Sequence, residues 1–127
     1  MTTTNTNPDA AKEKEDLLGH LPAELLEKIR SRVALEDVQA HARHDLDENG
    51  MYFDGHLVLT EGELGHFRHV DGQWQGQWMP VAGIAGARIV EGLSMNLLRL
   101  VSDKKVLAEY RFTLRHAKEV ARLQRRL

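Results

Sequence analysis

The sequence contains no cysteine, so neither a disulfide framework nor a thiolate nucleophile or metal ligand is available to the chain. It also lacks any run of about 18 apolar residues, and it therefore predicts no membrane-spanning helix within its 127 positions. The first residues carry neither the basic start nor the apolar stretch of a secretory signal. These absences are compatible with the cytosol, and we expect a cytoplasmic protein that is at most associated with a membrane surface.

Neither sign of charge dominates the composition, but the charges are unevenly distributed along the chain. In total, 17 Lys and Arg stand against 19 Asp and Glu. Residues 1–65 hold 6 basic and 14 acidic side chains, whereas residues 96–127 hold 9 basic and 3 acidic ones. A chain polarised in this way can orient on a charged partner, although ordinary solvated faces explain the pattern equally well. The apolar fraction of 42% is typical of one globular domain and argues against wholesale disorder.

The N-terminal region predicts a tail followed by a helical arm. Residues 1–7 are polar and aperiodic, which is typical of a disordered tail. Asn7-Pro8-Asp9 is a helix-start sequence, with a capping amide, a proline in the first turn and an acid near the positive end of the dipole. We expect this first helix to end at Gly19 and a second amphipathic helix to cover Pro22–Arg32, so that the arm spans residues 8–34.

From residue 36 onward the apolar residues recur at every second position, which predicts strands rather than helices. In the first strand the alternating face consists of Val38, Ala40, Ala42, His44 and Leu46. Turn sequences at Asn49-Gly50, Asp71-Gly72 and Asp103-Lys104 indicate hairpins. Seven short strands are predicted, over residues 38–46, 57–60, 64–70, 73–79, 87–90, 95–102 and 105–112. Strands at this spacing favour an antiparallel sandwich or barrel.

The last segment returns to helical periodicity and is the most clearly amphipathic part of the chain. At about 100° per residue, one half of the cylinder carries the apolar residues Leu114, Ala117, Val120, Ala121, Leu123 and Leu127. The other half carries Arg115, Lys118, Arg122, Arg125 and Arg126. We therefore expect a C-terminal helix that packs its apolar side on the strands and presents a basic face.

This order of elements resembles the bacterial pleckstrin-homology-like (PH-like) domains. "HLVLTEGELGHF" (His56–Phe67) is similar to their step from one strand through a turn into the next, and "WMPVAGI" (Trp78–Ile84) is similar to their Trp–Pro–apolar–Ile step. "RFTLRHAKEVARL" (Arg111–Leu123) resembles the strand-to-helix closure in the soluble N-terminal regions of some bacterial ABC exporters. The resemblance covers about residues 36–127. It implies an α+β fold in which a PH-like barrel or sandwich of about seven strands is closed by the C-terminal helix and preceded by two N-terminal helices.

The resemblance implies a non-catalytic binding or regulatory module that contacts a protein partner or associates with itself. The exporter likeness further implies an accessory cytoplasmic domain of a membrane transporter and, for a chain that continues beyond Leu127, a transmembrane region downstream. The first hairpin departs from the phosphoinositide-binding members, because it carries Asp45, Asp47 and Glu48 where they resemble one another in a basic cluster. These carboxylates would repel a phosphate, so headgroup binding is not expected.

Other function classes have less support from the residues. The basic C-terminal helix suits an anionic membrane surface, and peripheral binding there is the main alternative. A small barrel that binds nucleic acid is disfavoured, because the chain has a net charge of −2 and no strand interleaves basic and aromatic residues. The serines lie outside any Gly-x-Ser-x-Gly sequence, so we expect no enzyme.

Two sequence patterns resemble metal-binding sites, but neither is sufficient to predict one. Residues 45–50 begin like an EF-hand loop, but position 12 is His56 instead of a glutamate and the flanking patterns are strands, so we expect a hairpin turn. The His-x-x-His pairs His41/His44 and His66/His69 fall in strands, where residues i and i+3 point to opposite faces. Only a cross-strand site remains open, and no metal or other cofactor is predicted.

Trp74 and Trp78 lie four apart in a predicted strand and therefore share one face. They form either an exposed aromatic platform for a partner or lipid interface, or a pair of rings packed under one of the helices. The pattern favours packing. The candidate binding surface consists of these two residues together with the basic helical residues Arg115, Lys118, Arg122, Arg125 and Arg126.

Overall fold

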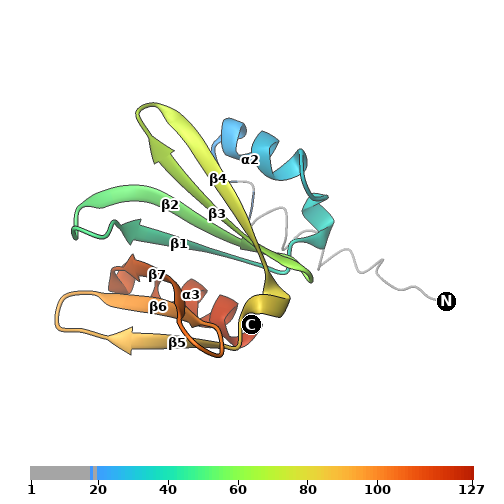
Figure 1. The fold of residues 1–127 in the computed structure, drawn as a ribbon. Coiled ribbons are helices and arrows are strands. Elements are labelled where there is room, and N and C mark those ends of the chain that lie inside the picture. Colours follow the sequence, from blue (N-terminus) through green and yellow to red (C-terminus); the bar gives the residue numbers. More distant parts are fainter. Residues whose placement is uncertain (1–17, 19) are drawn as a thin grey trace.

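The computed structural model describes Leu18 and residues 20–127, and it has the α+β organisation expected from the sequence. Within this part of the chain, helix α2 (Ala23–Arg30) precedes seven strands and helix α3 (Ala117–Arg125) follows them (Figure 1). The strands are β1 (Ala40–Leu46), β2 (Tyr52–Leu59), β3 (Glu63–Val70), β4 (Gln73–Pro80), β5 (Gly86–Glu91), β6 (Asn96–Val101) and β7 (Val106–Phe112). Single 3-10 turns, η1 (Leu35–Asp37), η2 (Val81–Gly83) and η3 (Leu114–His116), precede β1, β5 and α3.

The seven strands form one antiparallel sheet in the order β4-β3-β2-β1-β7-β6-β5. Its two halves meet at β1 and β7, which are joined by the single residue pair Leu46–Arg111. Figure 1 shows the halves as two separate parts of the sheet, with α2 alongside β4. Helix α3 packs mainly on β1 and also contacts β5 and β6. β4 and β5 are the outer strands of this order, so the hydrogen-bonded ladder is open between them.

Local turn chemistry explains why consecutive strands pair as hairpins. Asp71 and Gly72 both have positive φ, 51° and 79°, as a two-residue turn that follows the twist of its strands requires. Gly50 likewise has a φ of 78° in the turn after β1. At Gly55, on β2, an added Cβ would lie 2.4 Å from Nε2 of His44 on the neighbouring strand. Glycine is therefore needed there for a close side-chain approach.

The alternation of the strands produces two apolar cores on opposite faces. The main core lies between the two sheet halves and α3, and it includes Leu57, Leu98, Phe112, Val120 and Leu123. The second core lies between α2 and the other face of β2–β4, and it includes Leu25, Ile29, Val58, Phe67 and Trp74. Two cores of this kind explain why both faces of β2 are buried along Gly55–Leu59.

All seven predicted strands are present, and the main corrections concern element ends. β2 begins at Tyr52 rather than residue 57, because pairing with β1 extends it. The C-terminal helix begins at Ala117, since η3 occupies the preceding residues, and Leu114 is 74% exposed rather than part of the apolar stripe. The second helix is confirmed in shorter form. The tail and the first predicted helix lie outside the described residues, except for Leu18, which is buried in the second core.

Candidate functional site

The outer face of α3 and the preceding turn carries the five predicted basic side chains. Val120 and Leu123 are fully buried beneath the helix, which directs the basic residues outward. All five are exposed, and none forms an ion pair with another described residue: Arg115, Lys118, Arg122, Arg125 and Arg126. This face, called the basic face below, is a cationic surface with no ion pair to another described residue.

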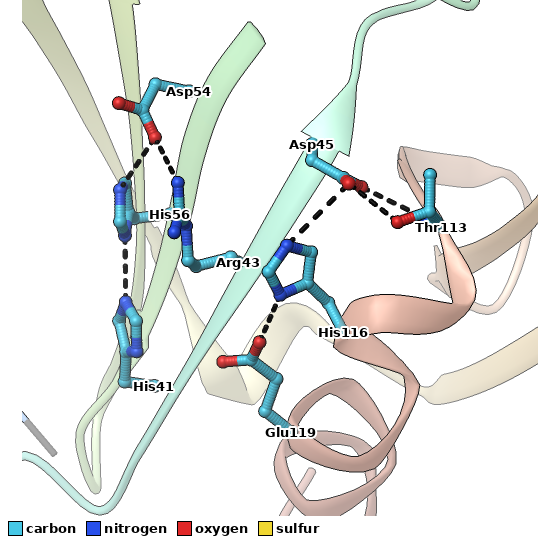
Figure 2. Close-up of polar contacts among 8 residues, drawn as sticks. All are labelled: His41, Arg43, Asp45, Asp54, His56, Thr113, His116 and Glu119. Atoms are coloured by element: carbon cyan, nitrogen blue, oxygen red, sulfur yellow. Dashed lines mark hydrogen bonds and ion pairs between the residues drawn. The ribbon is translucent and has the colours of Figure 1, made fainter. Parts of the chain in front are cut away.

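A polar cluster fixes the beginning of α3 against β1. Asp45 accepts a hydrogen bond from the backbone N–H of Thr113 at 2.8 Å and another from the Thr113 hydroxyl at 2.7 Å. The buried ring of His116 lies between two carboxylates, with Nε2 3.6 Å from Asp45 and Nδ1 in contact with Glu119 (Figure 2). Burial alone would raise the pKa of Asp45, but the hydrogen bonds from Thr113 outweigh it and lower that pKa.

A second polar chain runs across the face of β1 and β2 that α2 also covers. Nε2 of His41 lies 2.9 Å from Nδ1 of His56, and the two rings stack. On the other side of His56, Nε2 lies 3.4 Å from Asp54, which accepts a hydrogen bond from Arg43 at 2.8 Å. Figure 2 shows this order from His41 through His56 and Asp54 to Arg43. Nε2 of His56 is buried and makes no hydrogen bond within the described part of the chain.

The opposite face of β1 carries another histidine pair. Nε2 of His44 lies 2.7 Å from Nε2 of His66, and both rings contact Tyr110. His44 is 3% exposed because it lies over Gly55 and beside Phe53. Each pair can share one proton in an N–H···N hydrogen bond while both rings stay neutral.

Burial keeps all four of these histidines uncharged at neutral pH. Desolvation is the largest cause in each case, and it lowers the pKa of His41 to about 3 and that of His44 to about 2. The same cause lowers the pKa of His56 to about 4 and that of His66 to about 4. The neighbouring imidazoles and arginines lower these pKa values further, whereas Asp54 opposes the shift at His56.

The structure separates the His-x-x-His pairs as expected for strands. His41 and His44 contact partners on opposite faces of β1, and His69 is exposed beside Trp74 while His66 faces the interior. Among the described residues, no group of three or more His, Cys, Asp or Glu side chains is arranged to hold a metal ion. The contacts His41–His56 and His44–His66 join neighbouring strands. The i, i+3 spacing of the His-x-x-His pairs does not predict them.

The EF-hand-like segment is a hairpin turn between β1 and β2, as expected. Oδ1 of Asp47 accepts hydrogen bonds from the backbone N–H groups of Asn49 and Met51, both at 2.9 Å. Glu48 lies 3.8 Å from Arg68. The carboxylate of Asp47 therefore forms hydrogen bonds within its own turn, as in an Asx turn.

The two tryptophans face α2. Trp74 is 7% exposed and belongs to the second core, and Trp78 is half-buried against the same core and under Arg32. The packed arrangement is therefore the one observed, and an exposed platform that includes Trp74 is wrong. The tryptophans and the basic face belong to different parts of the fold, since α2 covers the former and α3 carries the latter.

Comparison with known proteins adds no relative: no family, no curated protein and no solved structure matches the chain. Among the described residues, no helix is both long enough and apolar enough to cross a membrane.

Proposed function

We propose that the chain is a non-catalytic docking module of PH-like fold, in which the basic face of α3 contacts an acidic protein surface. Seven antiparallel strands followed by an amphipathic C-terminal helix support the PH-like assignment, because the resemblance implies these elements in this succession. In this proposal the two sheet halves and α3 form a barrel-like sandwich around the main core.

The single observation that carries the docking role is the basic face itself. Some cations of this chain have a carboxylate within reach, as Arg32 has Glu63 and Arg99 has Glu109. Five exposed cations on one short segment form no ion pair with another described residue, and in this proposal they pair with the charges of a partner. Complementary charge across an interface raises the association rate and fixes orientation.

The first half of the chain is acidic in its sequence, so self-association is the form of docking we propose to test. Residues 1–65 carry 14 acidic and 6 basic side chains, and Glu24 and Glu27 are exposed on α2. The basic face of one copy would then contact the acidic half of another. The exporter resemblance extends the proposal to a cytoplasmic accessory domain of a membrane transporter.

Sedimentation velocity over a range of concentrations and salt tests this proposal. Wild-type protein is expected to associate at low salt and to dissociate as salt screens the charges. Arg122→Glu/Arg126→Glu reverses two charges of the basic face and should abolish association. Lys104→Glu/Lys105→Glu makes the same change in net charge in the exposed β6–β7 turn and should not. A wild-type protein that is monomeric throughout, or equal effects of both variants, would contradict self-association through this face.

Peripheral binding to an anionic membrane is the second candidate, and Leu114 favours it. This leucine is 74% exposed and directly precedes Arg115, which places an apolar side chain beside cations. Basic residues near an anionic bilayer each contribute about 1 kcal/mol. Co-sedimentation with phosphatidylserine-containing vesicles should therefore fall about tenfold or more in Arg122→Glu/Arg126→Glu. No pelleting of wild-type protein, or equal pelleting with pure phosphatidylcholine, would remove this candidate.

A further inference from the structure

Strand β4 ends the order of the sheet, and its outer edge pairs with no other described strand (Figure 1). The pairing with β3 is regular along the whole of β4, and next to it the N–H of Val81 donates to the carbonyl of Gly62 at 3.0 Å in the same register. Because bonded and non-bonded pairs alternate in an antiparallel ladder, the odd-numbered residues of β4 are bonded to β3. The backbone groups of Trp74, Gly76 and Trp78 therefore point outward, and they make no hydrogen bond to another described residue.

The two outer strands of the sheet differ in how their edges are protected. β5 carries the exposed Arg88 and Glu91, and the carbonyl of Ala87 accepts a hydrogen bond from Nε2 of Gln124 at 3.0 Å. β4 contains no charged residue, and its one proline is the last residue of the strand. Charged side chains and covering elements are the usual means by which a protein keeps another strand from pairing with its edge. The edge of β4 lacks the charges and is therefore the one at which a further strand can pair.

The sequence of this edge reads the same in both directions. Residues 74–78 are Trp-Gln-Gly-Gln-Trp, so Gly76 lies at the centre of a palindrome. When two such strands pair antiparallel about a two-fold axis at Gly76, identical residue types stand opposite each other. Trp74 is then opposite Trp78 of the second copy, and Gln75 is opposite Gln77. The outward backbone groups coincide as well, because in this register the three outward residues pair only with one another.

We propose that two copies of this chain pair through β4, antiparallel and centred on Gly76, so that the sheet continues from one copy into the other. Each outward residue of β4 exchanges two backbone hydrogen bonds with the residue opposite it. Gln75 and Gln77 are exposed, and their amides hold both donors and an acceptor, so they can hydrogen-bond across the two copies. The contact uses no charged side chain and is therefore separate from the docking through the basic face.

The pairing is expected to be weak, because a single short strand contributes most of the contact. We expect a Kd on the order of 1 mM for such a dimer. At the micromolar concentrations of sedimentation velocity it is barely populated, so the association through the basic face is measured without interference from it.

Because the chain has no cysteine, single engineered cysteines report the register of this pairing directly. Gln75→Cys and Gln77→Cys are mixed and oxidised in about 0.5 M salt, which screens the charges of the basic face. One variant is labelled with ¹⁵N, so that mass spectrometry separates the mixed dimer from the two uniform ones. In the proposed register the two cysteines form a non-bonded pair with Cα atoms about 4.5 Å apart, a distance that a disulfide spans.

The mixed disulfide dimer should exceed either uniform dimer about tenfold, because pairing raises the effective concentration of the opposite thiol. The control mixes Gln75→Cys with Asn49→Cys, at an exposed residue in the turn between β1 and β2, and should give the three dimers in a statistical ratio. A statistical ratio for Gln75→Cys with Gln77→Cys as well would overturn the proposal.

NMR spectra of the ¹⁵N-labelled full chain test the same pairing without a cross-link. In the same high salt, the amide resonance of Gly76 should shift as the protein concentration rises from about 0.05 to about 2 mM, through the expected Kd. Gln75→Lys/Gln77→Lys places like charges opposite each other across the dimer and should remove the shift. Arg122→Glu/Arg126→Glu should retain it, which distinguishes this contact from association through the basic face. A shift that persists in the lysine variant, or that is lost in the arginine variant, would contradict the proposal.

Discussion

Mild acid is expected to destabilise the fold steeply, because four buried histidines must stay neutral in the folded chain. Their pKa values lie between about 2 and about 4 in the folded state, against about 6.5 for an unfolded histidine. A histidine whose pKa is lowered by folding contributes its full stability above pH 6.5. That contribution is lost as the pH falls toward the folded value, since only the unfolded chain then takes up a proton.

The size of the effect follows from the number of protons. At pH 5 each unfolded histidine binds about one proton more than its folded counterpart, which gives a slope of about 1.4 kcal/mol per pH unit per histidine. Between pH 7 and pH 5 each one then loses about 1.9 kcal/mol, so four lose about 7 kcal/mol at most. If the folded chain opens locally and lets water reach a histidine ring, the loss of unfolding free energy is smaller. Even half of this value is a large share of the 5–15 kcal/mol typical of a domain.

Urea denaturation across this pH range, followed by fluorescence of the buried Trp74, measures the slope. Replacing one pair, as in His44→Gln/His66→Gln, should remove about half of the pH dependence in addition to any change in overall stability. His69→Gln alters an exposed histidine and should leave the slope unchanged. A wild-type slope of about one proton or less between pH 5 and pH 6 would refute the reasoning, because it would mean that the paired rings are already protonated or hydrated in the folded state.

Three further predictions concern packing and the contact between Asp45 and Thr113. Leu25→Ala should cost about 2–5 kcal/mol in urea denaturation by opening a cavity under α2, whereas Leu114→Ala, at an exposed position, should change stability by less than about 0.5 kcal/mol. Gly55→Ala should cost about 1–3 kcal/mol because its Cβ would meet a histidine ring, and Gly62→Ala, with open space around it, is the control; equal effects would contradict the close approach. Asp45→Asn should cost about 1–3 kcal/mol and increase hydrogen exchange in the first turn of α3, and unchanged exchange there would contradict its anchoring role.

The strand pattern could be predicted because local signals and tertiary packing agree there. The Asp71-Gly72 sequence takes the positive φ values that its hairpin needs. The alternation along Ala40–Leu46 places small and apolar side chains in the main core. Disagreement appears at Leu114, where the helical pattern includes a residue that the structure places in a 3-10 turn. The start of this segment depends on a contact that is distant in sequence, because the N–H and hydroxyl groups of Thr113, just before the 3-10 turn, donate to Asp45.

The histidine pairs could not be predicted in the same way, because they depend on registration between strands. His41 and His44 invite comparison at a spacing of three, yet each contacts a histidine on another strand. The register between β1 and β2 also shifts after His44, so counting outward from the hairpin turn does not place these rings correctly. Their signal in the sequence is compositional only: histidines stand at inward positions of successive strands where apolar residues are expected.

The junction between β1 and β7 affects how the two halves of the sheet would separate when the protein unfolds. Because only one residue pair joins β1 and β7, backbone hydrogen bonds contribute little to holding the two halves of the sheet together. Cohesion comes from side chains gathered under α3 and from the bond between Asp45 and Thr113. A chain truncated before α3 should therefore lose the packing between the two halves of the sheet, instead of forming a smaller, intact sheet.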